Sequence, residues 1–488
     1  MAGERLLFCK KGDLATVTVL QREDSHKELR VNDVPEVPTD YGSLQAFHLL
    51  AHLPCLLHRN PRKALVLCFG AGITTGAMAT HPFKQIDAVE RCPDVIEANP
   101  HFLEENQNVL ADRRVRLVID EARQYLSRTK RLYDVIASDA THPRSSDSWM
   151  LYTTEFYELC AKRLYPHGIM CQWLPVHGLK PPEYKRIIRS FLDVFPSTTL
   201  WFVNRFTFLL GQLKASPISF RFVAGRLTEE RVKNDLKPLN LSDPYEFLSC
   251  FLADREALET YTRRVRANTD GSPIPRGQTN RRLAVDTKPL NLSGLCGIRK
   301  SVATILKSVE EEPRSVAEKL EKCFEAKKHI LEGRIFCFHQ MLTEERESYR
   351  KALKLNPADR DALHLLGQAE FSWLLSEAKQ CLDAGDPDRA CRLYWKALRV
   401  NSTSAAPDHN LGVVDLRKGR FDRAIQHFKK AADKIPWNAE THYNLAICHW
   451  KMGRRRPCRL ELEKALTLNP GMEKARQALE NLKGLRVP

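Results

Sequence analysis

The stretch that decides the fold is "LVLCFGAGITTGA", residues 65–77. It begins as a short apolar run, which is typical of a buried strand, and continues into Gly70, Gly72 and Gly76 before a predicted helix. Glycines at such a turn let a ligand approach the backbone closely, and the start of the following helix favours anionic or polar groups. A glycine-rich turn is a weak signal by itself, so its meaning depends on the sequence around it.

Four further apolar runs follow, and segments with helical periodicity separate them. Strands that alternate with helices predict a parallel sheet with helices on both faces, which is a doubly wound, Rossmann-like α/β domain. We expect this domain to cover residues 51–215. The four runs are "QIDAVE" (85–90), "VRLVID" (115–120), "YDVIASD" (133–139) and "GIMCQWLP" (168–175).

Three of these predicted strands end in an acid: Glu90, Asp120 and Asp139. Open parallel sheets bind ligands at the carboxyl ends of their strands, so the three acids are expected at the ligand-binding edge. Glu90 follows Gly72 by 18 residues, a spacing at which a carboxylate can accept hydrogen bonds from both ribose hydroxyls of a nucleoside. Asp120 is then placed to meet an adenine amino group. The alternative is that these acids only cap the helices that follow them.

The N-terminal residues 1–50 show a different pattern. "ATVTVLQRE" (15–23) and "KELRVND" (27–33) alternate apolar and polar residues, as half-buried strands do. The turn residues Asp24, Ser25 and His26 lie between them. We predict a small antiparallel β unit here.

Residues 216–315 are less regular, and the segment between positions 267 and 294 is rich in Pro, Gly, Asn and Arg. This composition favours an irregular extension or linker, and one interpretation is a mobile loop.

From residue 316 to residue 488 the chain is repetitive, with a period of 34 residues and about 11 extra residues before Ala390. This period resembles that of the tetratricopeptide repeat (TPR) family, and it predicts an all-α solenoid with a groove for a protein or peptide partner. Gly412, Ala424, Phe428, Ala431 and Pro436 recur as Ala446, Cys458, Leu462, Ala465 and Pro470.

Composition sets outer limits. With 488 residues, 43% hydrophobic and 28% charged, the chain is a globular protein of several domains. It has no apolar run of about 18 residues and no signal-like start, so we expect neither a membrane span nor secretion. Its 14 cysteines include no C-x-x-C pair, which indicates reduced thiols and a cytoplasmic protein rather than a disulfide framework or a zinc site. The net charge is +16, but the sequence has no basic motif with interleaved aromatic residues. The charge therefore indicates a broadly basic surface.

The order of these motifs resembles the spermidine synthase (polyamine aminopropyltransferase) family over roughly residues 5–210. The glycine-rich turn, Glu90, Asp120 and "YDVIASD" are followed by "LYTTEFYELCAKRLYPHGIMCQW" (151–173). The resemblance implies a small β domain ahead of a doubly wound domain of methyltransferase type. It also implies a decarboxylated S-adenosylmethionine donor, whose aminopropyl group moves to an amine without a metal.

Residue roles also come from this resemblance. Gly70 and Gly72 are expected at the tail of the donor, Glu90 at its ribose and Asp120 at its adenine. Asp139 is expected to be the general base. That role is chemically sound, because a free amine has a pKa near ~10 and must lose a proton as it attacks.

The sequence departs from the family at two acids. Ala71 stands where the family has an aspartate that holds the donor amine, and His142 stands where a second aspartate meets the acceptor amine. His142 is therefore either a surface or capping residue, or a contact of the substrate near Asp139. Tyr152 and Gln172 are candidate substrate contacts, and core packing is the alternative for aromatic residues in this segment. The same two alternatives, a contact with the substrate or packing in the core, apply to Trp149 and Trp173.

Three functions stay open at this point. The first is an aminopropyltransferase, and the second is a methyltransferase that uses intact S-adenosylmethionine, with the repeats selecting a large acceptor. The third is a non-catalytic TPR scaffold with a vestigial nucleoside site. A homodimer is expected only by analogy with spermidine synthases.

Overall fold

The computed structural model describes residues 4–22, 25–145, 148–216, 218–275, 286–306 and 314–484. The chain divides into two compact units, one formed mainly by residues 27–363 and the other mainly by residues 364–488. Of the domain boundaries expected from the sequence, the one at residue 50 falls inside a helix, and the one at residue 315 lies close to the start of another.

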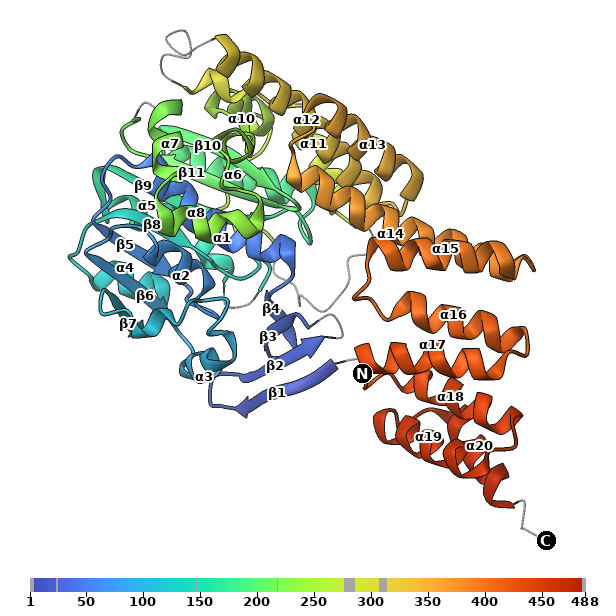
Figure 1. Ribbon diagram of the computed structural model, residues 1–488. Helices are drawn as coiled ribbons and strands as arrows, with labels where there is room; N and C mark the ends of the chain where they lie inside the picture. Colours follow the sequence, from blue (N-terminus) through green and yellow to red (C-terminus); the bar gives the residue numbers. More distant parts are fainter. Residues whose placement is uncertain are drawn as a thin grey trace. The chain divides into compact units, whose positions relative to one another are not determined.

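The larger unit is built on an eight-stranded sheet with the order β12-β10-β11-β9-β8-β5-β6-β7 (Figure 1). The pairings among β5 to β9 are parallel, and β11, β10 and β12 continue the sheet antiparallel beyond β9. The predicted doubly wound sheet is confirmed. Its strands are β5 (Lys63–Leu67), β6 (Gln85–Glu90), β7 (Val115–Ile119), β8 (Tyr133–Ser138), β9 (Leu164–Pro175), β10 (Ser197–Val203), β11 (Phe206–Gln212) and β12 (Phe251–Ala253).

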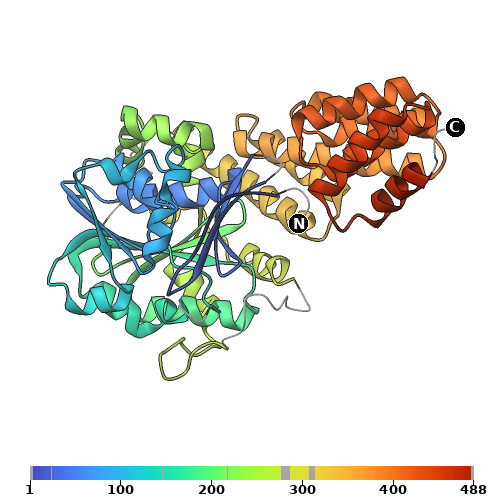
Figure 2. The ribbon, with the colours of Figure 1, turned by 90° about the horizontal axis from the view of Figure 1, so that it is seen from below.

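Both faces of this sheet are buried, because successive residues of a strand point to opposite sides. Val66 and Ala137 pack into one hydrophobic core, whereas Leu67 and Ile136 pack into the other. Figure 2 shows helices on both sides of the sheet. The first core is covered by α1 (Tyr41–Leu57), α2 (Ile73–Ala79), α7 (Phe220–Leu227), α8 (Glu230–Leu236) and α9 (Pro244–Leu248), and the second by α4 (Ala122–Arg128), α5 (Thr154–Ala161), α6 (Pro181–Val194), α10 (Arg255–Thr262) and α11 (Lys288–Cys296).

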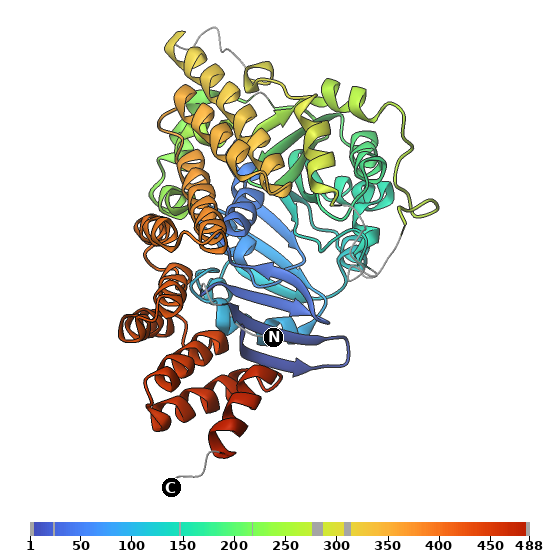
Figure 3. The ribbon, with the colours of Figure 1, turned by 90° about the vertical axis from the view of Figure 1, so that its right-hand side faces the viewer.

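A four-stranded N-terminal sheet precedes this domain, as predicted. Its order is β1 (Glu4–Lys11), β2 (Thr16–Arg22), β3 (Lys27–Val31) and β4 (Val34–Pro38). In Figure 3 these strands, drawn in dark blue, lie next to the light blue part of the large domain. The contact is a small core in which Val19 and Val37 meet Ile73 of α2 and Val95 of α3 (Pro93–Glu97). Ser25 has a φ of 68°, as a tight turn requires, and Asp24 lies outside the described residues.

The prediction of an irregular chain between residues 216 and 315 is wrong for most of the described part. Helices α7 to α11 lie there, and each of α7, α9 and α10 begins at a side chain that accepts backbone N–H bonds: Ser219, Asp243 and Asp254. These helices are short, so their periodicity was too weak to outweigh the loop-like composition. Residues 276–285, in the middle of the expected loop, lie outside the described residues.

The C-terminal part is helical, as the 34-residue period predicts. Small residues allow the helices of a pair to approach closely: a Cβ atom on Gly412 would lie 2.7 Å from the ring of Phe428. The 11 extra residues lengthen α14 to 24 residues. The helices are α12 (Arg314–Phe338), α13 (Leu342–Leu355), α14 (Arg360–Asp383), α15 (Pro387–Val400), α16 (Ala406–Arg417), α17 (Phe421–Lys434), α18 (Ala439–Lys451), α19 (Arg455–Leu468) and α20 (Glu473–Gly484).

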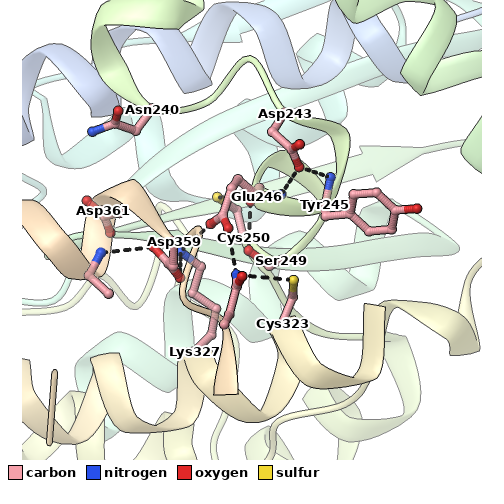
Figure 4. Close-up of polar contacts among 12 residues, drawn as sticks. Asn240, Asp243, Tyr245, Glu246, Ser249, Cys250, Cys323, Lys327, Asp359 and Asp361 are labelled. Carbon is pink, nitrogen blue, oxygen red and sulfur yellow. Dashed lines mark hydrogen bonds and ion pairs between the residues drawn. The ribbon is translucent and has the colours of Figure 1, made fainter. Parts of the chain in front are cut away.

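The first helical pair, α12–α13, is grouped with the α/β domain by a buried polar cluster (Figure 4). The Lys327 Nζ atom of α12 lies 3.3 Å from carboxylate oxygens of both Glu246, on α9, and Asp359, before α14. Asn356 donates to Glu246 at 2.7 Å. Burial opposes the charge of Lys327, but the two carboxylates raise its pKa well above the ordinary value.

Candidate functional site

A cavity of about 1310 Å³ lies at the carboxyl edge of the parallel strands. The N-terminal sheet forms one wall through Val31 and Glu36, and α1 contributes Ala46 and Phe47. The strand ends and the loops after them form the other walls. The position matches the rule that open α/β sheets bind ligands where the strand order reverses, here between β5 and β8.

Hydrogen bonds between neighbouring strand ends bring the predicted residues together. The backbone N–H groups of Phe69, Asp120 and Asp139 each donate to a carbonyl of the adjacent strand end at 3.0 Å. Gly70, Glu90, Asp120 and Asp139 all line the cavity as a result. Gly72 does not line it in this structure.

The glycine-rich turn depends on residues without a side chain. Gly70 and Gly72 have φ values of 56° and 79°, in the left-handed region that favours glycine. A Cβ atom on Gly72 would lie 2.5 Å from the Phe69 ring. Asn99 and Asn106 donate to the Ala71 carbonyl at 3.0 and 2.9 Å, which fixes the turn from the side of the following helices.

Glu90 and Asp120 bind nearby backbone as well as facing the cavity. Glu90 accepts the N–H of Gly70 at 3.1 Å and that of Cys92 at 2.9 Å, although burial raises the pKa of its carboxyl. Asp120 accepts the N–H of Glu121 at 2.9 Å. Neither acid is the N-cap of the helix that follows it: α3 begins after Cys92, and α4 begins after Glu121, whose side chain accepts the N–H of Gln124. The carboxylates of Glu90 and Asp120 keep lone pairs that can accept from a ligand.

Asp139 faces the cavity directly after β8. Its carboxylate accepts a hydrogen bond from the Thr74 hydroxyl at 2.7 Å. Burial raises the pKa of Asp139 to about 7, and the bond from Thr74 opposes this increase. A carboxyl group with this pKa can exchange a proton near neutral pH.

His142 lines the same cavity three residues later, but both of its ring nitrogens are engaged. Its Nδ1 accepts the N–H of Arg144 at 3.1 Å, so Nε2 carries the proton and donates to the His177 carbonyl at 2.9 Å. Burial lowers the pKa of His142 to about 4. Gly178 permits this arrangement, because a Cβ atom there would lie 2.6 Å from Nε2. His142 is therefore a neutral wall residue here and not a second base.

Two tentative substrate contacts, Tyr152 and Gln172, do not line the cavity. Tyr152 is fully buried and its hydroxyl donates to the carbonyls of Ala140 and Thr141, so it supports the loop after Asp139. Gln172 is buried within β9. Its neighbour Trp173 lines the cavity, as expected for adjacent strand residues that point to opposite faces.

The sequence did not single out four residues that matter for the geometry: Thr74, His177, Arg205 and Lys288. Thr74 lies in α2 within the quoted glycine-rich stretch, and the other three line the cavity. Of these residues, only His177 could have been predicted at the site, because the pair His177–Gly178 comes shortly after the predicted strand that forms β9.

His48, His52 and Asp235 are a group whose metal-binding atoms converge within 4.8 Å in the described part of the chain. Hydrogen bonds explain this cluster: the Asp235 Oδ2 atom accepts from His48 at 2.8 Å and from His52 at 2.6 Å. The other nitrogen of His52 then accepts from His81 at 2.8 Å. The acceptors of these bonds are one carboxylate and one nitrogen of His52.

Residues 46–214 match the model of the spermine/spermidine synthase domain. This segment forms a spermidine synthase-like domain. Residues 415–482 match a tetratricopeptide repeat model, which confirms the predicted repeats over this part of the chain. The repeats expected between residues 316 and 414 stay a prediction.

Relatives of the spermidine synthase-like domain include polyamine aminopropyltransferases. The enzyme of Thermotoga maritima is 26% identical over 207 residues, which are 41% of this chain and 68% of that protein. The enzyme of Bacillus subtilis is 29% identical over 179 residues, which are 35% of this chain and 64% of that protein.

A solved structure, a spermidine synthase in complex with the transition-state analogue AdoDATO, is 23% identical and covers 44% of this chain and 75% of its own, with a TM-score of 0.40. Among the described residues, no helix is both long and apolar enough to cross a membrane.

Proposed function

We propose that the spermidine synthase-like domain transfers an aminopropyl group from decarboxylated S-adenosylmethionine to an amine, with Asp139 as the general base. The observation that carries this proposal is the position of Asp139. It shares one cavity with Gly70, Glu90 and Asp120, and its carboxyl has a pKa near 7. The relatives named polyamine aminopropyltransferases support the reaction class.

In the proposed reaction the amine nitrogen attacks the propyl carbon next to the sulfonium. The carbon–sulfur bond breaks, its electron pair stays on sulfur, and methylthioadenosine leaves. Asp139 accepts the proton that the nitrogen loses. The sulfonium is already a good leaving group, so positioning and the proton acceptor are what the protein has to supply.

Glu90 and Asp120 are proposed to bind the ribose and the adenine, and Gly70 to face the donor tail. Gly72 is proposed to act indirectly, because it shapes the turn without lining the cavity. The repeats of residues 364–488 are proposed to bind a protein or peptide partner. A homodimer stays a prediction, which light scattering of the full chain can check.

One observation favours a second candidate, methyl transfer from intact S-adenosylmethionine. The family resemblance implies an aspartate for the donor amine at the position of Ala71, which offers only a buried methyl group. A donor that keeps its carboxylate would need that acid less.

Calorimetry of the full chain with three nucleosides separates these functions. Tighter binding of decarboxylated S-adenosylmethionine than of the intact form supports aminopropyl transfer, and the reverse order supports methyl transfer. If neither sulfonium nor methylthioadenosine binds, both transferase functions are wrong and the scaffold hypothesis stands.

A further inference from the structure

The wall of the cavity beyond Asp139 carries an unexpected charge. We propose that the acceptor is an amine that also bears a carboxylate, such as an amino acid, and not a diamine. This inference rests on the proposed aminopropyl transfer and specifies its acceptor.

Cationic side chains line this part of the cavity. Arg144, Arg205 and Lys288 all belong to its wall. Arg205 pairs with Asp40 at 2.8 Å, and Arg144 with Glu183 at 3.4 Å. Both arginines line the cavity, whereas the two acids that pair with them do not.

The cations and two histidines form one connected group. The rings of His142 and His177 have centroids 5.2 Å apart, and His177 is 6.3 Å from Trp173. Enclosure in the cavity, together with His142, Lys288 and Arg205, lowers the pKa of His177. The position of His142, which the resemblance assigns to a second acid, is thus held by a neutral ring whose pKa is lowered by burial and by the charge of Arg144.

Few carboxylates are available to balance a diamine there. Asp139 accepts from the Thr74 hydroxyl, and Glu90 and Asp120 are assigned to the donor. Glu121 also lines the cavity, but its carboxylate caps α4 by accepting the N–H of Gln124. Asp286 also lines the wall but lies 3.3 Å from the ammonium of Lys288. Glu36, on β4, is itself engaged in an interaction.

Electrostatics then discriminates between two kinds of acceptor. A diamine carries two positive charges, and each needs a carboxylate partner; Asp139 can serve only the amine that reacts. An acceptor with a carboxylate at its other end would instead meet Arg205 and Lys288, and a guanidinium is well suited to bind a carboxylate through two hydrogen bonds. The chemical step is unchanged: the amine attacks, the carbon–sulfur bond breaks and Asp139 takes the proton.

Two acceptors of equal length test this inference: 4-aminobutanoate and 1,4-diaminobutane, which differ by a carboxylate in place of one amine. With the full chain and decarboxylated S-adenosylmethionine, we expect a kcat/KM at least tenfold higher for 4-aminobutanoate, measured as methylthioadenosine released. Arg205→Glu and Lys288→Glu should each reduce or reverse this ratio. The exposed Lys130→Glu is the control and should leave it unchanged.

A preference for 1,4-diaminobutane in the wild-type chain would overturn the inference and leave the proposed function intact. If neither acceptor reacts, their binding to the chain saturated with methylthioadenosine decides by calorimetry. Tighter binding of 4-aminobutanoate, lost in Lys288→Glu, supports the inference, and any other order overturns it. If the proposed function itself is wrong, no donor nucleoside should bind, and this result distinguishes the two failures. Circular dichroism of each charge-reversal variant checks that it folds.

Discussion

The pKa of Asp139 connects burial to chemistry at the scale of a residue. A general base works best when its pKa lies near the working pH. Burial brings this carboxyl to about 7, and the Thr74 hydroxyl stabilises the charged form at 2.7 Å. The protein therefore holds at this point a proton acceptor that is ionised in a large fraction of molecules at neutral pH.

Asp139→Asn should reduce turnover at least 100-fold and leave donor affinity unchanged, because asparagine cannot accept the proton. It should also raise the free energy of unfolding at pH 8 by about 1–2 kcal/mol. The folded-state pKa is above the ordinary value, so ionisation of this carboxyl costs stability progressively as the pH rises from about 4 to about 7. Urea unfolding and calorimetry measure the two effects. Turnover that stays at the wild-type level would rule out the base assignment.

Thr74→Val removes the hydrogen bond that stabilises the Asp139 carboxylate. The pKa of Asp139 should rise, so the pH of half-maximal kcat should move upward by about half a pH unit. Thr75→Val is a matched control, since the buried Thr75 hydroxyl has no hydrogen-bond partner in the described part of the protein. Equal pH profiles for the two variants would contradict the role of Thr74.

Part of the site could be predicted from the sequence, because three of its acids lie at the ends of predicted strands. Glu90, Asp120 and Asp139 each follow an apolar run, and their place at one cavity follows from parallel pairing alone. The hydrogen bond from Thr74 to Asp139 could not be predicted, because the direction of the Thr74 hydroxyl depends on how α2 packs. Tyr152 and Gln172 were wrongly expected at the cavity, since the sequence does not say which side of a loop or strand faces the ligand.

At the scale of elements, a network of hydrogen bonds connects α1 to α8. Arg226 lies 3.3 Å from His81, which donates to His52, and His52 and His48 both donate to Asp235. These hydrogen bonds lower the pKa of the Asp235 carboxyl, although burial opposes the effect, and burial lowers the pKa values of His52 and His81. The hydrogen bond from His81 requires that the accepting nitrogen of His52 is unprotonated, and Asp235 accepts its two bonds as a carboxylate.

This arrangement predicts a loss of stability in mild acid. His52 and His81 bind protons less readily in the folded state, so the free energy of unfolding should fall as the pH drops below about 6.5. Asp235 contributes in the same direction, with its stabilisation lost only at much lower pH. Urea unfolding of the Asp139→Asn variant between pH 7.5 and pH 5 measures the trend, because Asp139 contributes in the opposite direction over this range in the wild-type chain. A flat profile over this range would contradict it.

Asp235→Asn should cost about 2–4 kcal/mol of unfolding free energy, because it weakens two buried hydrogen bonds to a charge. Asp193→Asn is the control. It disrupts a partly exposed pair with Arg189 on α6 and should cost about 0.5 kcal/mol or less. Equal losses would mean that the buried network contributes no more than a surface pair.

The elements themselves were partly predictable. Alternating apolar runs located the strands, and the 34-residue period located the helical repeats. Helices α7 to α11 were missed, although Val223, Leu227, Val232 and Leu236 are buried along them. Each of these helices is only five to nine residues long, which is too short for a clear periodic pattern.

At the scale of the whole molecule, the repeat signal and the compact units divide the chain differently. The helical pairs begin near residue 316 in sequence, yet α12 and α13 belong to the compact unit that holds the α/β domain. The Lys327 cluster gives the physical reason, because it ties α12 to α9 through a buried ammonium shared by two carboxylates (Figure 4). A sequence period cannot reveal such a tertiary contact.

Lys327→Met should destabilise this unit by about 3–5 kcal/mol, since it leaves Glu246 and Asp359 buried without their cation. Lys328→Met, at the exposed neighbouring position, should change the free energy of unfolding by less than about 0.5 kcal/mol. Thermal and urea unfolding of the full chain measure both. A loss at Lys327 no larger than at Lys328 would show that the cluster does not hold α12–α13 in place.

The identity of the nucleoside product tests the central claim most directly. The full chain is incubated with decarboxylated S-adenosylmethionine and the two four-carbon amines, and the nucleosides are then identified by mass spectrometry. The account predicts methylthioadenosine together with an aminopropylated amine, and neither product with Asp139→Asn. Absence of methylthioadenosine with the wild-type chain, or S-adenosylhomocysteine formed only from intact S-adenosylmethionine, would contradict it.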